Sequence, residues 1–301
     1  MKCLVTGGVG FVGTNLIKRL LKDGHDVVSV DNYSTGKKEN HQEDCQYYDF
    51  DVSSKTNMFL SDVSSSTYES HGWKKKKYDI IFHLAALARI QPSLKRPSKT
   101  IYNNFISTLN VLEYARNMKA KVIYSGSSTF HHGLYGSPYA WSKYGGEQLC
   151  KLYSKVYGVS TAIARFYNVY GPHQLEDGEY ATVIGIFEKQ FRNNESFTIV
   201  GDGEQRRDFT HIDDIVDALV LMSKKEFKGE KFELGRGKNY SINEVAAMFG
   251  NNPYHSRIYL PQRSGEYPFT LADNTFVKKT LGWNPPGSLK DYIKKIVNDK
   301  N

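Results

Sequence analysis

The sequence predicts an α/β protein built on a doubly wound parallel sheet, with a smaller interleaved C-terminal α/β lobe. Short apolar runs alternate with segments in which leucine and isoleucine recur at helical spacing. The apolar runs are continuous, as is typical of strands that are buried on both faces of a sheet. Strand–helix alternation of this kind is typical of a parallel sheet with helices on both sides.

The strands of the sheet are predicted in the first half of the chain. Their ranges are residues 2–6, 26–31, 78–85, 121–125 and 159–166. The apolar positions of the first helix are Leu16, Ile17, Leu20 and Leu21, and Gly24 supplies its left-handed end. Those of the second helix are Ile101, Phe105, Leu109 and Leu112. A third helix is predicted over about residues 139–157.

The alternation stops after residue 166, where Gly, Pro, His, Asp and Asn crowd residues 168–180. A later helix has its apolar positions at Ile212, Ile215, Val216, Leu219 and Met222, and we expect it to return to the first half. The tail from residue 241 predicts two or three short helices. The chain is thereby divided into a domain of residues 1–166 plus about 211–232 and a lobe of residues 167–210 plus about 233–301.

The composition excludes several classes of protein. Of the 301 residues, 24% are charged and 40% hydrophobic, which rules out collagen-like, coiled-coil and wholly disordered chains. The three cysteines are widely spaced and match neither a disulfide framework nor a zinc pattern. The uncharged stretch over residues 3–17 is shorter than the ~20 residues of a membrane span, and no secretory signal is recognisable. We therefore expect a cytoplasmic protein with no membrane contact.

A glycine-rich loop, TGGVGFVG, connects the first strand to the first helix. Gly7, Gly10 and Gly13 allow a tight turn, a close backbone approach to a pyrophosphate, and close packing of helix on sheet. Phe11 and Val12 complete the loop. The helix N-terminus then presents free N–H groups and a positive dipole end to the anion. The loop predicts a dinucleotide-binding site.

Two acidic positions extend this prediction. Asp31, at the end of the second strand, is placed to accept hydrogen bonds from ribose hydroxyls, and Asn32 follows it. Because a carboxylate repels a 2′-phosphate, NAD is favoured over NADP. Asp51 and Val52 follow the next apolar stretch. They are candidates for the adenine edge, or Asp51 is a turn residue.

A catalytic arrangement is predicted at the start of the third helix. In Tyr139-Ala-Trp-Ser-Lys143, the phenol and the ammonium are four residues apart and therefore share one helix face. A nearby cation, together with an oxidised nicotinamide, favours the phenolate and lowers the pKa of Tyr139. Ser127 and Thr129 follow a predicted strand, where their hydroxyls can bind a substrate oxygen whose proton Tyr139 removes. The combination predicts hydride transfer from an alcohol.

With these residues, the chain resembles the extended short-chain dehydrogenase/reductase family, in its UDP-glucose 4-epimerase-like branch. The motifs that carry the resemblance are TGGVGFVG, DN at 31–32, HLAA at 83–86, Asn104, SGSST at 125–129, YAWSK at 139–143, FYNVYGP at 166–172, RRDFTHIDD at 206–214 and RSGE at 263–266.

The resemblance implies a role for each matching residue. Tyr139 is the base, Lys143 holds the nicotinamide ribose, Ser127 polarises the reacting hydroxyl, and Thr129 is a secondary donor. The implied cofactor contacts are Leu84, Ala85, Ala86 and Asn104. The implied substrate contacts are Asn168, Arg207 and Arg263 at the diphosphate, Glu266 at the nucleotide ribose, and Thr270, whose small side chain leaves room for a 2-acetamido group. His211 is expected to support a helix start.

The reaction implied is inversion of C4 of a UDP-hexose through a transient 4-keto sugar. UDP-glucose and UDP-galactose are the expected pair, and their N-acetylated forms are also accommodated. Dehydratases and decarboxylases of the family place acids after the Ser/Thr position, whereas this chain has Phe130 and His131. The segment over residues 130–138 is shorter than usual. His131 and His132 lack a nearby Cys or carboxylate cluster, so no metal is expected.

Two alternatives stay open. One is a reductase or 3,5-epimerase of the same family that acts on a GDP- or dTDP-sugar. The other is a non-catalytic relative that binds RNA through its basic surface, since the net charge is +8. The run Lys74–Lys77 is expected to be a solvated loop and not a nucleic-acid patch. The intact Tyr139, Lys143 and Ser127 argue against an RNA-binding relative, so no nucleic-acid partner is expected. The resemblance also implies a homodimer through a four-helix bundle of the helices over about residues 100–118 and 140–157.

Overall fold

The computed structural model describes residues 1–54, 76–250, 256–265 and 267–300. At its centre lies a seven-stranded sheet in the order β11-β6-β5-β4-β1-β2-β3, and every neighbouring pair is parallel. The strands are β1 (Lys2–Thr6), β2 (Asp26–Asp31), β3 (Cys45–Asp49), β4 (Ile80–His83), β5 (Lys121–Ser127), β6 (Thr161–Phe166) and β11 (Lys228–Leu234). The predicted doubly wound parallel sheet is confirmed. The strand order reverses beside β1, which opens a crevice at the carboxyl ends of the strands.

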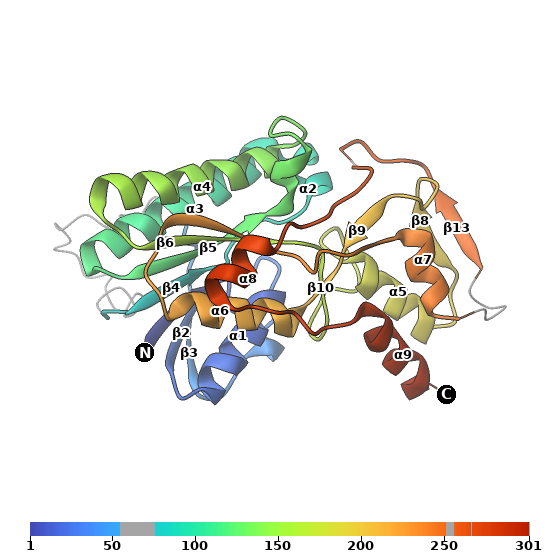
Figure 1. The fold of residues 1–301 in the computed structure, drawn as a ribbon, viewed down its shortest axis with the longest axis horizontal. Coiled ribbons are helices and arrows are strands. Elements are labelled where there is room, and N and C mark those ends of the chain that lie inside the picture. Colours follow the sequence, from blue (N-terminus) through green and yellow to red (C-terminus); the bar gives the residue numbers. More distant parts are fainter. Residues whose placement is uncertain (55–75, 251–255, 266, 301) are drawn as a thin grey trace.

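Helices cover both faces of this sheet (Figure 1). On one face, α1 (Phe11–Lys22), α6 (Ile212–Ser223) and α8 (Thr275–Leu281) share an apolar core with β1, β4 and β11. On the other face, α3 (Pro97–Met118) and α4 (Pro138–Tyr157) pack side by side and share a second core with β4, β5 and β6. Helix α6 packs on the first half of the chain: its buried residues Ile215 and Leu219 lie in one core with Leu16 and Leu20 of α1.

The remaining elements form a smaller group with its own core. They are β7 (Val169–Tyr170), α5 (Val183–Arg192), β8 (Phe197–Val200), β9 (Arg206–Asp208), β10 (Thr210–His211), β12 (Asn239–Ser241), α7 (Ile242–Met248), β13 (Arg257–Leu260) and α9 (Leu289–Lys300). Their strands pair in three two-stranded sheets. Phe187, Phe197 and Phe249 pack together at the centre of this core.

Helix α4 is fixed by its cap and by a buried ion pair. The Ser137 hydroxyl accepts a hydrogen bond from Ala140 N at 3.1 Å, Pro138 occupies the first turn, and Gly158 ends the helix with φ +69°. Farther along, the carboxylate of Glu147 accepts two hydrogen bonds from Arg165 of β6, at 2.8 and 2.6 Å. Both side chains are buried, so losing either one leaves an uncompensated charge in the interior. This pair fixes the middle of α4 against β6.

Two sequence predictions about loops have definite outcomes. The His211 side chain accepts a hydrogen bond from Asp213 N at 3.2 Å and caps α6, which confirms its role at a helix start. The strand expected over residues 78–85 is shorter than predicted, because the chain leaves the sheet after His83. Lys74 and Lys75 of the basic run lie outside the described residues.

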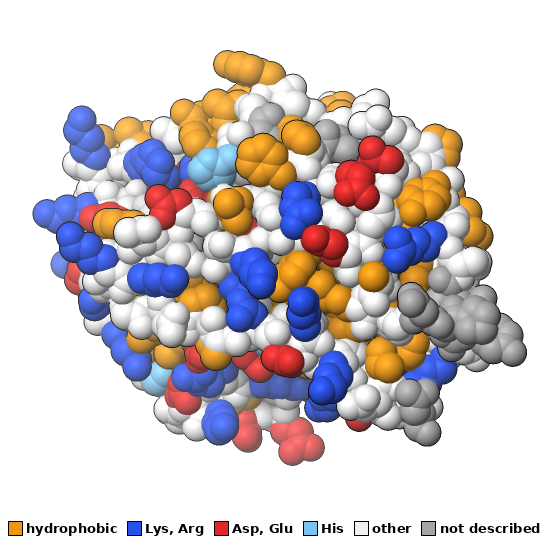
Figure 2. All heavy atoms as spheres, turned by 45° about the vertical axis from the view of Figure 1, so that its right-hand side comes forward, with side chains coloured by type: hydrophobic (Ala, Val, Ile, Leu, Met, Phe, Trp, Pro, Cys, Tyr) orange, Lys and Arg blue, Asp and Glu red, His pale blue; other side chains and the backbone are white. Residues whose placement is uncertain are grey.

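Charge is mixed on the face seen in Figure 2, where Lys and Arg side chains are interspersed with Asp and Glu. In the part of the chain that the structure describes, no helix is long and apolar enough to cross a membrane. Cys3, Cys45 and Cys150 are free thiols, and all three are buried.

Candidate active site

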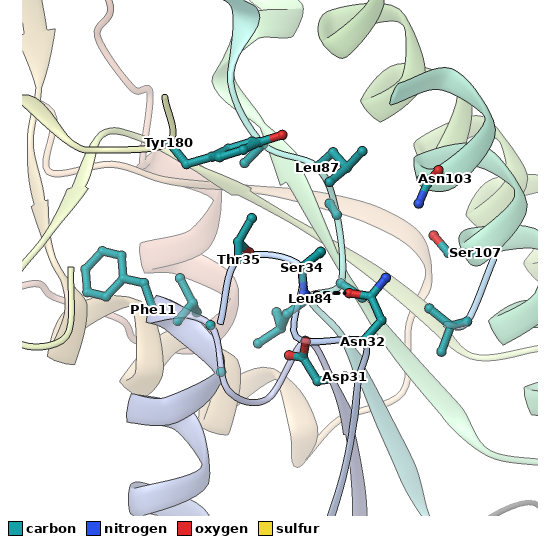
Figure 3. Close-up of a pocket in the computed structure, with 18 of the residues that line it drawn as sticks. Phe11, Asp31, Asn32, Ser34, Thr35, Leu84, Leu87, Asn103, Ser107 and Tyr180 are labelled. Atoms are coloured by element: carbon teal, nitrogen blue, oxygen red, sulfur yellow. Dashed lines mark hydrogen bonds between the residues drawn. The ribbon is translucent and has the colours of Figure 1, made fainter. Parts of the chain in front are cut away.

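A cavity opens at the carboxyl ends of the central strands, above β1, β2 and β4 (Figure 3). Most of the predicted cofactor residues line it: Gly7, Gly10, Phe11, Val12, Gly13, Asp31, Asn32, Asp51, Val52, Leu84, Ala85 and Ala86. The loop after β1, the end of β2, the turn after β3 and the segment after β4 therefore meet at one place.

The glycine loop has the form that a dinucleotide requires. Gly7 has φ +75°, and a Cβ on it would lie 2.7 Å from Ala85 N. A Cβ on Gly13 would lie 2.2 Å from Gly7 O, so α1 packs against the loop without side chains between them. Gly10 caps α1 without a side-chain hydrogen bond, which leaves the first N–H groups of the helix directed at the cavity. These features fit a pyrophosphate group.

Asp31 lies at the bottom of the cavity (Figure 3). Its carboxylate accepts hydrogen bonds from Val9 N at 3.1 Å and from Tyr33 N at 2.9 Å. Burial raises the pKa of Asp31, and these backbone donors work against that effect. Each carboxylate oxygen has a second lone pair, so the group fits ribose hydroxyls in the cavity.

Asp51 makes the contacts of a turn residue and also lines the cavity. Its carboxylate accepts hydrogen bonds from Ser53 N at 2.8 Å and from Ser53 Oγ at 2.7 Å, which is the contact of a turn aspartate. It also lines the cavity, where its other oxygen accepts a hydrogen bond from Asn32 Nδ2 at 3.2 Å. Contact with an adenine ring stays a prediction.

Asn104 supports the cavity from behind. Its amide binds the backbone of Leu87, with distances of 2.8 Å to Leu87 N and 3.1 Å to Leu87 O, and it donates to Ser142 Oγ at 3.0 Å. The buried Asn104 therefore ties the segment after β4 to α4. On the same helix, Asn103 and Ser107 line the cavity. Sequence reasoning missed both, although their i, i+4 spacing places them on one helix face.

The predicted catalytic residues meet where β5 ends and α4 begins. The Ser127 hydroxyl accepts hydrogen bonds from Thr129 Oγ1 at 3.0 Å and from Thr129 N at 3.3 Å. Tyr139 lies in the first turn of α4, and its neighbour Ser127 acts to lower the pKa of its phenol. One turn farther on, Lys143 Nζ donates to Ser125 Oγ at 3.2 Å and lies 4.7 Å from the centre of the Tyr124 ring.

The pKa of Tyr139 differs from the one expected. Burial raises the pKa of Tyr139, and the bond to Ser127 and the positive charge of Arg89 lower it by less. In the protein alone, then, desolvation outweighs the charge of Arg89, and the expected lowering of the Tyr139 pKa does not appear. Burial lowers the pKa of Lys143 to about 8, so the ammonium is still largely charged at neutral pH.

The residues expected at the substrate are only partly brought together. Asn168 Nδ2 donates to Asp208 O at 3.1 Å and to Thr270 Oγ1 at 3.2 Å. Arg207 Nη1 donates to the carbonyl groups of Arg206 at 2.9 Å and Tyr267 at 2.7 Å. Arg263 is exposed, and Glu266 lies outside the described residues.

Thr270 has a different setting from the one expected. Its side chain is buried, and its hydroxyl accepts hydrogen bonds from Asp208 N at 3.0 Å and from Asn168. The small side chain thus fills an internal position and presents little surface to a sugar. Its contribution is to hold Asn168 in place.

The segment after Thr129 packs away from the cavity. Phe130 stacks on Tyr144 with ring centres 5.7 Å apart, and the Arg165 guanidinium lies 3.9 Å from the centre of the Phe130 ring. The His131 Nε2 lies 3.1 Å from a carboxylate oxygen of Glu233 on β11. Within the described ranges, no cluster of His, Cys, Asp and Glu has the arrangement of a metal site.

A segment from the smaller group closes the cavity from the side opposite the glycine loop. Leu175, Tyr180 and Thr182 line it, and Figure 3 shows Tyr180 across the cavity from Asp31. Arg89 also lines the cavity and donates from Nε to Tyr180 O at 3.2 Å. Sequence reasoning missed these residues, because no local pattern marks them.

The family model for the NAD dependent epimerase/dehydratase family matches residues 3–235, most of the chain. The chain belongs to this family. Membership confirms both the resemblance to the epimerase branch of the extended short-chain dehydrogenases and the prediction of NAD as the cofactor.

Individual relatives match along nearly the whole chain. A putative UDP-glucose 4-epimerase of Methanocaldococcus jannaschii is 32% identical, over 98% of this chain and 97% of that protein. A UDP-glucuronate 4-epimerase of Thermodesulfobacterium geofontis is also 32% identical, over 98% and 94%. Among solved structures, a UDP-glucose 4-epimerase of Thermotoga maritima with UDP-glucose is 29% identical, with a TM-score of 0.89 and coverage of 99% and 98%. The chain is thus an enzyme of a family that acts on nucleotide sugars.

Proposed function

We propose that this protein is an NAD-dependent 4-epimerase that inverts C4 of a UDP-sugar. The observation that carries the proposal is the placement of Tyr139 and Lys143 at the start of α4 and of Ser127 at the carboxyl end of β5, the edge of the sheet where the cavity with the features of a dinucleotide site opens. Residues 1–166 with about 211–232 then hold the cofactor. Residues 167–210 with about 233–301 hold the nucleotide sugar.

Tyr139 acts on the C4 hydroxyl of the sugar in this proposal. NAD, when bound, supplies the acceptor and later the donor of the hydride that C4 loses and regains. Tyr139 removes the hydroxyl proton and leaves a 4-keto sugar, while Ser127 donates a hydrogen bond to the same oxygen. After the sugar turns in the site, Tyr139 returns the proton to the oxygen of the inverted carbon.

Lys143 places a positive charge one helical turn after Tyr139. Its ammonium is buried and held by Ser125, so its position is fixed before substrate binds. Such preorganised charge stabilises a developing phenolate without reorganisation during the reaction. In the family pattern the same ammonium holds the nicotinamide ribose, and its place one turn below Tyr139 is compatible with both roles.

The segment after Thr129 favours epimerisation over elimination or decarboxylation. It contains no carboxyl group between Ser127 and Gly133, and its first aromatic residue, Phe130, packs on Tyr144 and Arg165. A reaction that expels a hydroxyl needs an acid to protonate the leaving oxygen. The chain supplies no such acid at this place.

The nucleotide sugar can be tested with a small panel in D₂O. UDP-glucose, UDP-galactose, UDP-N-acetylglucosamine and UDP-glucuronate are incubated with the enzyme without added NADH and followed by proton NMR. The proposal predicts inversion at C4 of at least one sugar with no deuterium at C4, because the same hydride returns. Parallel incubations with GDP- and dTDP-sugars and added NADH test the alternatives, because a 3,5-epimerase would introduce deuterium at C3 and C5 there and a reductase would consume the NADH. If no sugar reacts, the proposal is wrong.

The assembly that we propose is a homodimer through α3 and α4. Neighbouring apolar side chains of α4 face in different directions. Tyr153 packs in the core, whereas Leu152 and Val156 are 48% and 58% exposed. Tyr102 of α3 is exposed as well. Two copies that bury these side chains would form a four-helix bundle. Sedimentation should show a dimer that Val156→Glu dissociates and that Tyr135→Glu, at a side chain 92% exposed elsewhere, leaves intact.

A further inference from the structure

His83 is a buried titratable side chain that the proposed mechanism does not use. It ends β4, directly before the residues 84–87 that line the cavity, and it is 1% exposed. Its Nδ1 lies 2.7 Å from Thr6 Oγ1, and its Nε2 lies 3.2 Å from Thr108 Oγ1. Thr6 ends β1 at the glycine loop, and Thr108 belongs to α3. The ring therefore bridges the strand that carries the glycine loop and the helix behind the cavity.

The partners of the two threonine hydroxyls decide which nitrogen of His83 carries the proton. Thr108 Oγ1 donates to Asn104 O at 2.7 Å, and a hydroxyl has a single proton to donate. Towards His83 the same oxygen is therefore an acceptor, so the proton lies on Nε2. In a neutral ring Nδ1 then accepts the proton of Thr6 Oγ1, which in turn accepts a hydrogen bond from Ala85 N at 3.3 Å.

The ring of His83 is neutral at physiological pH. Burial and, secondly, the positive charge of Lys143 lower its pKa to about 3. A doubly protonated ring would also turn an N–H towards Thr6, and the Thr6 proton would lose its acceptor. In the neutral ring with hydrogen on Nε2, every donor from Ala85 to Thr108 has one acceptor.

The hydrogen-bond chain continues from α3 to the helix that carries the proposed base. The Asn104 side chain binds Leu87 N at 2.8 Å and Leu87 O at 3.1 Å, and its Nδ2 donates to Ser142 Oγ at 3.0 Å. Ser142 Oγ donates to Tyr139 O at 2.9 Å. The side chains along this path are all buried: Thr6, His83, Thr108, Asn104 and Ser142.

The chain of hydrogen bonds fixes one wall of the cavity at two points. Thr6 holds Ala85 at its amide, and Asn104 holds Leu87, so both points lie on the segment that lines the cavity. This wall also packs closely on the glycine loop, because a Cβ on Gly7 would lie 2.7 Å from Ala85 N. The His83 ring does not itself line the cavity, and it joins the two anchors from behind.

We propose that His83 is a positioning residue for NAD. As the neutral ring with hydrogen on Nε2, it fixes residues 84–87 relative to the glycine loop and to the helix that carries Tyr139. The inference concerns cofactor binding and is independent of the sugar on which the enzyme acts. A site held by preorganised supporting residues binds more tightly than one that must be ordered by its ligand.

Titration of the apo protein with NAD tests the positioning role. His83→Leu should raise the Kd of NAD by about tenfold, because both hydrogen bonds of the ring are lost. Thr6→Val removes the hydroxyl between Ala85 and the ring and should have a similar effect. Thr6→Ser keeps this hydroxyl and should change the Kd by less than about threefold. NAD binding as tight as wild type in both His83→Leu and Thr6→Val would overturn the proposal.

A combined variant separates positioning from stability. His83→Leu alone leaves the Thr6 proton unpaired in the interior and should unfold at a lower urea concentration than wild type. The variant with Thr6→Val, His83→Leu and Thr108→Val removes all three polar side chains together, so it should recover part of this stability. NAD binding should stay weak, because Ala85 N still lacks its acceptor. If the NAD affinity recovers together with the stability, His83 has only a structural role and the proposal fails.

Trp283→Phe is the matched control for a lost buried hydrogen bond. Trp283 Nε1 donates to Asp214 O at 2.8 Å in the core between α6 and α8, outside the cavity. This variant should be destabilised and still bind NAD with the wild-type Kd. If Trp283→Phe weakens NAD binding as much as His83→Leu, the affinity follows global stability and the proposal is wrong.

Nitrogen NMR of protein labelled with ¹⁵N-histidine tests the hydrogen-bond chain directly. The chain has nine histidines, so the signals that disappear in His83→Leu identify the ring. At pH 7 we expect hydrogen on Nε2 and none on Nδ1, in the apo protein and with NAD. A proton on Nδ1, or on both nitrogens, would overturn the assignment. If the NAD affinities change as expected and no sugar is inverted at C4, the 4-epimerase function fails while the role of His83 stands.

Discussion

Lys143 Nζ donates a hydrogen bond to Ser125 Oγ at 3.2 Å, which joins α4 to the carboxyl end of β5. Both residues are buried, and the ammonium lies over the Tyr124 ring. The cation of the Tyr139–Lys143 pair is thereby fixed by the strand that also supplies Ser127. The position of the Lys143 ammonium is therefore set by the fold before any ligand binds.

Replacement of Lys143 by methionine should lower kcat at pH 7 by roughly 100-fold or more, because general acid–base groups lose efficiency without their electrostatic support. Because the pKa of Lys143 is lowered to about 8, we expect the wild-type advantage over Lys143→Met to shrink as pH rises above 8. The pH dependence of kcat for the NAD-loaded proteins measures this. Ser125→Ala, which keeps the ammonium, should cost only a few-fold, since one hydrogen bond contributes about 1 kcal/mol. An equal loss in both variants would contradict a role for the charge.

Asp31 should control cofactor affinity and choice. In Asp31→Asn the charged acceptor is lost, and NAD affinity should fall roughly 10- to 100-fold, as expected from about 1.5–3 kcal/mol for a hydrogen bond to a charged group. Discrimination against NADP should weaken, since the repulsion of a 2′-phosphate disappears. Titration of the apo protein with each cofactor measures both effects. Asp26→Asn, at the exposed start of the same strand, is the control and should alter neither affinity.

Gly7 and Gly24 allow backbone strain to be separated from steric conflict. Both have positive φ, at +75° and +77°, but a Cβ on Gly7 meets Ala85 N at 2.7 Å and one on Gly24 meets nothing within 4 Å. Gly24→Ala should therefore cost about 1 kcal/mol of unfolding free energy. Gly7→Ala should cost roughly 3 kcal/mol and reduce the NAD content, because the loop must shift. Urea denaturation and cofactor analysis measure these effects. Similar costs for the two variants would contradict the packing argument.

Asp214 should make the protein less stable at neutral pH than at mildly acid pH. Its buried carboxylate accepts a hydrogen bond from Gly287 N at 3.1 Å, and burial raises its pKa to about 6 from 3.8. Since the folded state binds the proton more tightly than the unfolded state, the stability present below pH 4 is lost as pH rises through 6. A pKa shift of this size can change the free energy of unfolding by at most about 3 kcal/mol.

Asp214→Asn should remove this pH dependence. We expect it to raise the unfolding free energy at pH 7.5 by about 1 kcal/mol and to have little effect near pH 4, where wild-type Asp214 is protonated. Thermal denaturation at both pH values measures the difference. A destabilised Asp214→Asn at pH 7.5 would show that the carboxylate is stabilising.

The cofactor site was predictable because its signals are local. A glycine loop between strand and helix and an aspartate at the end of the next strand each mark a backbone requirement, and the topology of a parallel sheet brings them together. The pairing of Tyr139 with Ser127 was predictable for the same reason, since strand ends and helix starts share one edge of the sheet.

Residues that act through tertiary contacts were not predictable. Arg89 adopts a backbone conformation against its own preference, and its partner Tyr180 is distant in the sequence. The motif that contains Thr270 did not indicate that its hydroxyl accepts hydrogen bonds from Asn168 and from the backbone of Asp208, and its effect on a 2-acetamido group stays a prediction. Likewise, the sequence does not show which apolar side chains of α4 enter the core: Tyr153 is buried there and Leu149 packs against it, whereas Leu152 and Val156 are exposed.

The most direct test of the account replaces Tyr139 by phenylalanine and follows C4 of the panel sugars by NMR, at equal NAD content. The account predicts that wild type inverts C4 without external NADH and that Tyr139→Phe is slower by on the order of 10²–10⁴-fold, the range for loss of a general acid–base group. A Tyr139→Phe protein as fast as wild type, or a wild type that retains NAD and leaves C4 of every sugar unchanged, would contradict it.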